Sequence, residues 1–593
     1  MIKSTDSVGG GTETDSPSVG ERPRGPNRRK FLGQASAAAT LGAGALASLS
    51  VSSAQAIGAS SNSLGGLAPL AGVNTRRVME AFELRMAEAV QDARVPAATN
   101  LSNGDEARYP DKGGTYTKGL PHDSFGRVDL HAYQTFKTAL NSGKFSDFEK
   151  ITMGGTRTLN GPQGGLCFCL DALDNAQFGQ PQVPPAPPAA SDQNATELLE
   201  HYWASLLRDV AFTDYPSNSI AAQAAAELGS QLTYLGPRSS GQVTPDLLFR
   251  GGFPGETLGP YISQFFLLPT SFGSQPIDQQ QVTYLPNIDY GTSFAEWLNI
   301  QNGVDTGLRN QVDPQLRYRR NGRDLAAFTH VDVLYQAYFT AFLVLAGINP
   351  QPPGSIAFGG APLNPGNPYN NSTTENGFAT FGGPDFAATL AAVATVALNA
   401  VWYQKWFVHL RPRPEATGGL VHLIKTGRGN KTDVKLSNVI LNSHGLQQSF
   451  NKYGTWLLSQ AFPEGSPTHP AYPTGHGTIG GACITVLKFF FDGDFVIPNP
   501  VVPTSDGLSL VPYSGSDAGQ LTVNGELNKL GHNVTFGHGI HAGIHWRSDS
   551  DTALPLGEAV ALSFLRDRAK TYNEPFTVNL TKFDGTTATI SNQ

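Results

Sequence analysis

The hydrophobic pattern of the chain is helical over most of its length. Apolar residues recur at three- and four-residue spacing in residues 76–93, which predicts an amphipathic helix. Further helices are predicted over residues 197–212, 325–346, 384–409, 478–491, 526–541 and 551–570. In residues 384–409, alanine, valine and leucine surround the whole helix, which is typical of a helix buried in the core.

Turn-forming stretches separate these helices. Residues 181–190 are rich in proline and are expected to be extended, and the Gly/Pro/Asn-rich residues 354–383 are expected to form a long loop. A short β-hairpin is predicted over residues 576–590, with its turn at Asp584-Gly585. The pattern therefore predicts an all-α fold, a helical bundle with long loops and minor β-hairpins.

The composition restricts the partners. The chain has 593 residues and a net charge of −7 without a basic run, which argues against a nucleic-acid partner. Beyond the N-terminus no apolar run reaches about 20 residues, so no transmembrane span is expected. The three cysteines are too few for a disulfide framework. Cys167, Cys169 and Cys483 are all expected to be buried.

The N-terminus has the features of an export signal. Arg28 and Arg29 precede a stretch rich in alanine, leucine and glycine that ends at Ala54-Gln-Ala56. This pattern predicts a twin-arginine signal peptide over residues 1–56, and hence a secreted or envelope-associated protein. A flexible linker is expected over residues 57–75, and one catalytic domain over residues 76–593.

Three separate segments carry side chains suited to binding an oxyanion. In the first, Lys405 supplies a point charge, and Arg413 supplies a planar fork that matches two oxygens. In the second, Thr474 offers a hydroxyl and Gly475 an accessible backbone N–H at the start of a helix, where the macrodipole favours anions. His476 follows directly and can act as a general acid or base.

The third segment contains a histidine–carboxylate pair at helical spacing. Asp549 lies four residues after His545, so that its carboxylate can orient the imidazole from the next turn. Taken alone, each segment has a simpler interpretation: a surface cation, a helix cap or a core histidine. The presence of all three beside predicted helices favours a common site.

These segments resemble the signatures of vanadium haloperoxidases and related acid phosphatases. The likeness covers roughly residue 80 to the C-terminus and is strongest to the algal bromoperoxidase branch, with matching stretches at 321–324 and 464–476. The resemblance implies that His545 bonds vanadium, or attacks phosphorus in the phosphatases, and that His469 is a pocket histidine. It also implies a homodimer. With the twin-arginine leader, it points to actinobacterial haloperoxidases of meroterpenoid antibiotic pathways of the napyradiomycin type.

Two positions depart from the family pattern. Thr474 replaces serine and keeps the hydroxyl, whereas Gly539 stands six residues before His545, where the family has a second arginine. Losing a two-pronged guanidinium contact costs about 3–5 kcal/mol, on the order of a hundred- to a few thousand-fold in vanadate affinity. His538 is expected in the pocket, but not at the helical position that would replace the fork.

The resemblance and the missing arginine together indicate an enzyme that needs no cofactor. The expected activity is that of a vanadate-independent relative: a redox-neutral α-hydroxyketone rearrangement, a 1,2-shift, on a prenylated naphthoquinone-type substrate. Either His476 or His545 would act as the base, and Lys405 and Arg413 would stabilise the developing alkoxide. The alternatives are a working vanadium chloro- or bromoperoxidase, an acid phosphatase with a phosphohistidine at His545, and a non-catalytic anion-binding protein. A phosphate, covalent or not, is a further candidate ligand at His545.

Overall fold

The computed structural model describes residues 71–94, 100–167, 183–347 and 359–593. The expected signal peptide, most of the expected linker and Cys169 lie outside the described residues. The chain divides into two compact units, residues 1–90 and 91–593. Helix α3 (Ala71–Asp92) makes up the described part of the first unit. The helix predicted over residues 76–93 is confirmed, and it begins at Ala71, within the stretch expected to be linker.

The second unit is built mainly from helices. They are α4 (Asp105–Arg108), α5 (Leu130–Ser142), α6 (Phe145–Phe148), α8 (Asp192–Leu207), α9 (Ser219–Ser230), α10 (Phe294–Gln301), α11 (Gly322–Val331), α12 (Gln336–Leu345), α13 (Gly383–Tyr403), α14 (Pro414–Lys425), α15 (Asn438–Leu441), α16 (His444–Tyr453), α17 (Gly475–Phe490), α18 (Val523–Phe536) and α19 (Arg547–Ala569). Two π-helical segments, η5 (Gln404–His409) and η8 (Gly537–His541), extend α13 and α18. The predicted all-α class is confirmed.

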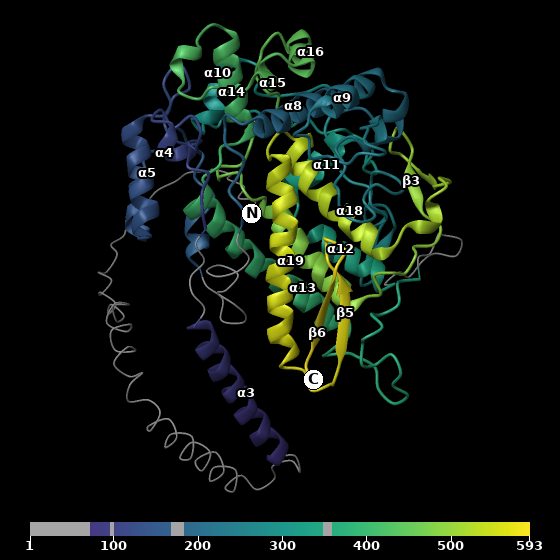
Figure 1. Cartoon of the computed structure of the whole chain (residues 1–593). Helices are drawn as coiled ribbons and strands as arrows, with labels where there is room; N and C mark the ends of the chain where they lie inside the picture. The colour runs from purple at the N-terminus through teal and green to yellow at the C-terminus, as the bar shows by residue number, and fades with distance from the viewer. Residues whose placement is uncertain (1–70, 95–99, 168–182, 348–358) are drawn as a thin grey trace, which may run out of the picture. The chain divides into compact units, whose positions relative to one another are not determined.

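The described residues contain three short antiparallel β-hairpins. They are β1 (Thr270–Phe272) with β2 (Gln275–Ile277), β3 (Val501–Pro503) with β4 (Leu510–Pro512), and β5 (Thr577–Thr581) with β6 (Thr587–Ser591). The last pair confirms the hairpin predicted over residues 576–590, with Val578 opposite Ile590. It lies beside the C-terminal part of α19 (Figure 1).

Helix α17 lies at the centre of the core and is buried along its whole length. It packs against α13 and α19. Glycines permit the close approach to α19: a Cβ added at Gly481 would lie 2.0 Å from the carbonyl oxygen of Leu554, and one at Gly557 would lie 1.9 Å from that of Thr478. Because the two backbones nearly touch, the N-terminal ends of α17 and α19 are held in one fixed arrangement.

Two sequence predictions need correction. The single helix predicted over residues 325–346 is two helices, α11 and α12, which meet at an angle of 103°. Asp332 ends α11 in an extended conformation and, as shown below, enters the site. Cys167, expected to be buried, is exposed, whereas Cys483 is buried in α17 as predicted.

Within the described residues, the stretch Gly383–Lys425 is long and apolar enough to cross a membrane, and the bent pair α11–α12 would also pass if it formed one span. The first part of this stretch is α13. Its residues Leu390, Val393 and Ala397 are fully buried against the protein core. We therefore interpret α13 as the core helix predicted from its apolar circumference.

Candidate functional site

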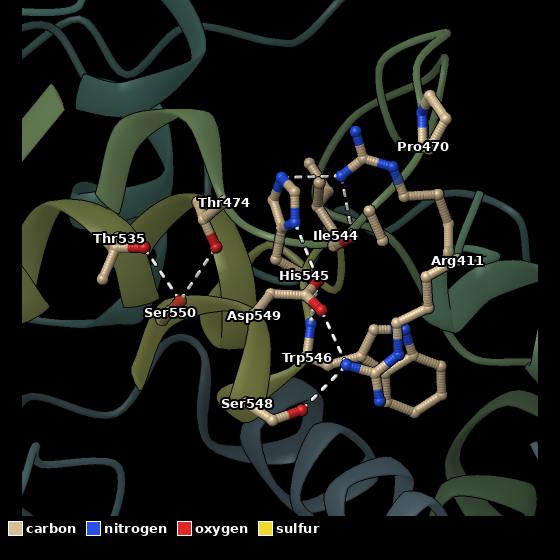
Figure 2. A network of polar contacts seen from close by, with 12 residues as sticks. Arg411, Pro470, Thr474, Thr535, Ile544, His545, Trp546, Ser548, Asp549 and Ser550 are labelled. Atoms are coloured by element: carbon tan, nitrogen blue, oxygen red, sulfur yellow. Dashed lines mark hydrogen bonds and ion pairs between the residues drawn. The ribbon is translucent and has the colours of Figure 1, made fainter. Parts of the chain in front are cut away.

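The three oxyanion-binding segments converge at the ends of three helices. The loop after η5 carries Arg413, which contacts His545 just before α19, with 2.8 Å between Nη1 and Nε2. Thr474, the residue before α17, donates its backbone N–H to the carbonyl oxygen of Asp549 in α19 at 3.0 Å. Segments far apart in the sequence thus form one buried cluster, as Figure 2 shows around His545 and Thr474.

Lys405 is fully buried in the π-helical segment η5. Its ammonium donates to the carbonyl oxygens of Pro470 and Ala471, at 3.0 and 2.7 Å, in the loop that leads into α17. Burial, and then the nearby charge of Arg413, hold the pKa of Lys405 well below its usual range. The lysine therefore fixes the loop before Thr474 and places its Nζ near the cluster.

Arg413 links the first segment to the other two. Its Nε donates to the carbonyl oxygen of His469 at 2.9 Å, and Nη1 donates to that of Ile544 at 3.1 Å and to His545 Nε2 at 2.8 Å. The guanidinium is 1 % exposed, and burial lowers its pKa to about 10. Arg413 remains a cation at neutral pH, aimed at the imidazole of His545.

Thr474 and Gly475 form the N-terminal end of α17. The Thr474 side chain does not cap the helix; its hydroxyl instead bonds that of Ser550 at 3.2 Å. A Cβ on Gly475 would lie 3.1 Å from the Trp402 ring, so glycine allows this tight contact. The backbone N–H groups of the first turn of α17 therefore keep their capacity to bind an anion.

His545 is held in a defined tautomer by Asp549. The two side chains, joined by a 2.9 Å bond between Nδ1 and Oδ2, are fully buried. Burial, and then Arg413 and Lys405, hold the pKa of His545 well below its usual range. The imidazole is therefore neutral, with Nδ1–H donated to Asp549 and the Nε2 lone pair accepting from Arg413. This is the form that a metal ligand or a nucleophile requires.

Arg411 completes this arrangement and was not among the candidate residues. Its guanidinium donates to the second carboxylate oxygen of Asp549 at 2.7 Å and to the Ser548 hydroxyl at 2.8 Å (Figure 2). The ring of Trp546 lies 4.7 Å from it. Sequence alone gave one signal for Arg411: it stands two residues before Arg413 in the same Arg-Pro-Arg run.

The remaining pocket histidines are slightly more exposed than the anion-binding residues. His469, His476 and His538 are 6 %, 8 % and 6 % exposed, whereas Lys405 is 0 % and His545 is 1 % exposed. The site therefore has an inner part, with the cations and the start of α17, and an outer part made of imidazoles. The donors of the inner part suit a compact oxyanion, and the imidazoles of the outer part are the more accessible groups.

His476 is paired with a carboxylate that sequence reasoning missed. Its Nε2 lies 3.0 Å from Oδ1 of Asp332, whose side chain is 2 % exposed. The pairing depends on the break between α11 and α12, which brings Asp332 to the end of α17. Because the sequence predicted one continuous helix there, the dyad could not be anticipated.

His538, one residue before the position that the family pattern gives to the second arginine, lies beside the other histidines of the site. In η8 the N–H of Ala542 bonds the carbonyl oxygen of Gly537, five residues earlier, so this turn holds one residue more than an α-helical turn. Within this turn, the side chain that reaches the neighbouring histidines is that of His538. The ring of His538 lies 4.4 Å from that of His476 and 5.6 Å from that of His545.

Gly539 packs closely against His545. A Cβ built there would lie 3.3 Å from both Cβ and the carbonyl oxygen of His545, and 3.8 Å from the Ser550 hydroxyl. The count along the sequence assumed an unbroken α-helix, whereas this turn is π-helical. That His538 does not replace the two-pronged fork stays a prediction. The structure brings the other predicted residues together around the site and places Gly539 against Cβ and the carbonyl group of His545.

The chain is similar in sequence to vanadium-dependent bromoperoxidases. The vanadium-dependent bromoperoxidase of Ascophyllum nodosum is 35 % identical over 529 residues, covering 85 % of this chain and 91 % of the alga's protein. That of Corallina officinalis is 31 % identical over 606 residues, covering 87 % and 98 %. No family model matches the chain.

A solved structure resembles the fold over a similar extent. The second vanadate-dependent bromoperoxidase of Ascophyllum nodosum, a homohexamer, superposes with a TM-score of 0.79 at 30 % identity, covering 87 % of this chain and 90 % of that one. Similar sequence and similar fold thus extend over the same large part of the chain.

Proposed function

The chain belongs to the vanadium-dependent haloperoxidase family, and we propose that its own reaction is a redox-neutral isomerisation on that scaffold. The substrate is an α-hydroxyketone of a prenylated naphthoquinone-type compound, in which a carbon substituent migrates to the neighbouring carbonyl carbon. The observation that carries this proposal is the ring of His538 beside those of His476 and His545, in a turn whose residue 539 is glycine where the family pattern has the second arginine. The glycine removes a permanent cation from the turn, and His538 presents an imidazole.

Vanadate, the cofactor of the family, fits the inner site only in part. His545 Nε2 would supply the nitrogen ligand, and Lys405, Arg413 and the start of α17 would bind the oxygens. Bound vanadate activates hydrogen peroxide for halide oxidation. Without the second guanidinium, about 3–5 kcal/mol of binding free energy is lost, on the order of a hundred- to a few thousand-fold in affinity. We therefore assign the turnover to the protein's own side chains.

The dyad of His476 and Asp332 supplies the base. Asp332 holds Nε2 of the imidazole, so Nδ1 is the nitrogen that exchanges a proton with the substrate. In the proposed reaction, Nδ1 accepts the hydroxyl proton, and the migrating C–C bond shifts with its electron pair. The carbinol carbon becomes a carbonyl, the former carbonyl oxygen becomes an alkoxide, and His476 returns the proton to it. No oxidant or reductant is consumed.

The inner site stabilises the transition state through its charge. The buried cation Arg413, together with the N-terminal end of α17, produces a positive potential where the alkoxide develops. These groups are fixed by hydrogen bonds to His469, Ile544 and the loop before Thr474, so little reorganisation is needed during the reaction.

The direct test uses protein purified without vanadate and incubated with the α-hydroxyketone in the absence of peroxide and halide. We expect an isomer of unchanged mass, identified by liquid chromatography and nuclear magnetic resonance. The substitution His476→Ala should abolish its formation. Unchanged substrate after prolonged incubation with folded enzyme would contradict the proposal.

A second candidate function is vanadium-dependent halide oxidation. In the neutral His545, oriented by Asp549 and Arg411, the Nε2 lone pair that now accepts from Arg413 is the one that would ligate vanadium. Bromination of a phenolic dye with hydrogen peroxide, bromide and micromolar vanadate tests it.

We propose that the same inner site also accepts phosphate, noncovalently or as a phosphohistidine on His545. The donors Lys405 and Arg413 and the amides of α17 suit a tetrahedral oxyanion. Intact-protein mass spectrometry would show an added mass on the order of 80 Da for a covalent phosphoryl group. The added mass should vanish in His545→Ala; an unmodified wild-type mass would exclude the covalent form.

The homodimer expected from the sequence also remains a prediction, which light scattering tests.

A further inference from the structure

His538 is a buried histidine without a fixed partner. Its side chain lies beside the rings of His476 and His545, and its Nδ1 is buried with no hydrogen-bond partner among the described residues. Other buried histidines, His541 among them, also have a ring nitrogen without a partner in the described residues. His538 is distinguished by its place against the ring of the candidate base, where this nitrogen can bind a ligand atom.

The other three pocket histidines are each held by a charged side chain. The pairs are His476 with Asp332, His545 with Asp549, and His469 with Arg413. Each of these contacts orients the imidazole and uses one of its ring nitrogens. Among these four, His538 is the imidazole left to interact with substrate through its own N–H group.

The surroundings of His538 keep it neutral. Burial, and then His476, Arg413, His330 and Lys405, hold its pKa well below the usual range. A neutral imidazole has one N–H donor and one lone pair. A histidine held neutral in this way can polarise a carbonyl group by hydrogen bonding without adding a full charge, as triosephosphate isomerase illustrates.

We propose that His538 is a catalytic residue that donates its N–H to the carbonyl oxygen of the α-hydroxyketone and stabilises the alkoxide formed there. This assignment rests on the rearrangement proposed above. Hydroxyl and carbonyl oxygens sit on adjacent carbons, so base and donor must be close neighbours, and the rings of His476 and His538 are 4.4 Å apart. His538 exchanges no proton: His476 removes it and returns it.

The same residue then determines which ligand the site prefers. A guanidinium at this position suits an oxyanion with several charged oxygens, whereas a neutral N–H suits one oxygen that gains charge only in the transition state. Position 538 therefore selects between oxyanion binding and carbonyl chemistry on one scaffold.

Three substitutions at residue 538 test the assignment. In His538→Ala, kcat should fall on the order of a hundredfold with KM changed less than about fivefold, the pattern for loss of a donor used in the transition state. In His538→Gln, an amide N–H replaces that of the ring, and kcat should recover to within about tenfold of wild type. In His538→Arg, the rearrangement should be lost, and orthovanadate should bind on the order of a hundredfold more tightly by titration calorimetry.

His541→Gln is the matched control, because His541 lies in the same π-helical turn but faces Tyr261, at 2.9 Å, instead of the pocket. It should leave both activity and orthovanadate binding within about threefold of wild type. Full activity in His538→Ala, or a glutamine variant as inactive as the alanine variant, would overturn the assignment. If wild type fails to rearrange the probe, the proposed function fails. Unchanged orthovanadate affinity in His538→Arg would separately refute the selection role of residue 538.

Discussion

Substitution of Gly539 tests whether the π-helical turn places residue 538, and not residue 539, in the pocket. If η8 were a regular α-helix, Gly539→Arg would restore the family's guanidinium and tighten vanadate binding. In the structure, any side chain at 539 instead starts 3.3 Å from Cβ and from the carbonyl oxygen of His545. Real Cβ contacts are rarely this close, so the backbone of His545 must shift.

The cost of this shift can be approximated from core overpacking, which typically destabilises by about 1–3 kcal/mol. Because alanine also gains about 1 kcal/mol over glycine in helix propensity, Gly539→Ala should lower the free energy of unfolding by at most about 2 kcal/mol. It should also disturb the 2.9 Å bond between His545 and Asp549 and weaken orthovanadate binding. Gly539→Arg should do both more strongly.

The assays are urea denaturation followed by circular dichroism, and titration calorimetry with orthovanadate. Gly519 supplies a matched control, since a Cβ there meets nothing within 4 Å, and Gly519→Ala should be neutral. Tighter orthovanadate binding by Gly539→Arg than by wild type would refute the reasoning and restore the α-helical alignment.

Three further predictions concern other parts of the chain. Asp332→Asn should lower kcat on the order of ten- to a hundredfold with little change in KM, because it removes a charge-assisted bond from the base; an unchanged kcat would remove Asp332 from the mechanism. Burial opposes the charge on His532, but Glu256 and Asp551 outweigh it and raise its pKa to about 9. The resulting stability, at most about 3 kcal/mol, is complete below pH 6.5 and is lost as pH rises through 9, which thermal melts should show and His532→Gln should flatten. Finally, replacing Arg28-Arg29 by Lys-Lys should retain the precursor in the cytoplasm, and undiminished secretion would contradict a twin-arginine signal.

Much of the fold follows from local patterns in the sequence. The apolar periodicity of α13, α17 and α19 predicts helices within a few residues of their observed ends. The same apolar side chains that produce this periodicity also hold the three helices in the core. The anion-binding residues also follow, since Arg413, Thr474, His545 and their neighbours stand at helix ends that the sequence marks with proline and glycine.

The parts that could not be predicted depend on departures from regular helix. The break at Asp332 is set by packing of two helices at 103°, and sequence periodicity continues across it. The π-helical turn at residues 537–541 adds one residue without changing the apolar pattern, so counting back from His545 did not reveal that His538 lies against the rings of His476 and His545. Both departures bring polar side chains to the site.

The most direct test of the central claim compares two activities of one preparation. Protein purified with added orthovanadate is analysed for bound vanadium, for peroxide-dependent bromination, and for rearrangement of the prenylated α-hydroxyketone. The account predicts vanadium well below one atom per chain, no bromination, and an isomer of unchanged mass formed with or without orthovanadate. Stoichiometric vanadium together with rapid bromination and no rearrangement would contradict it.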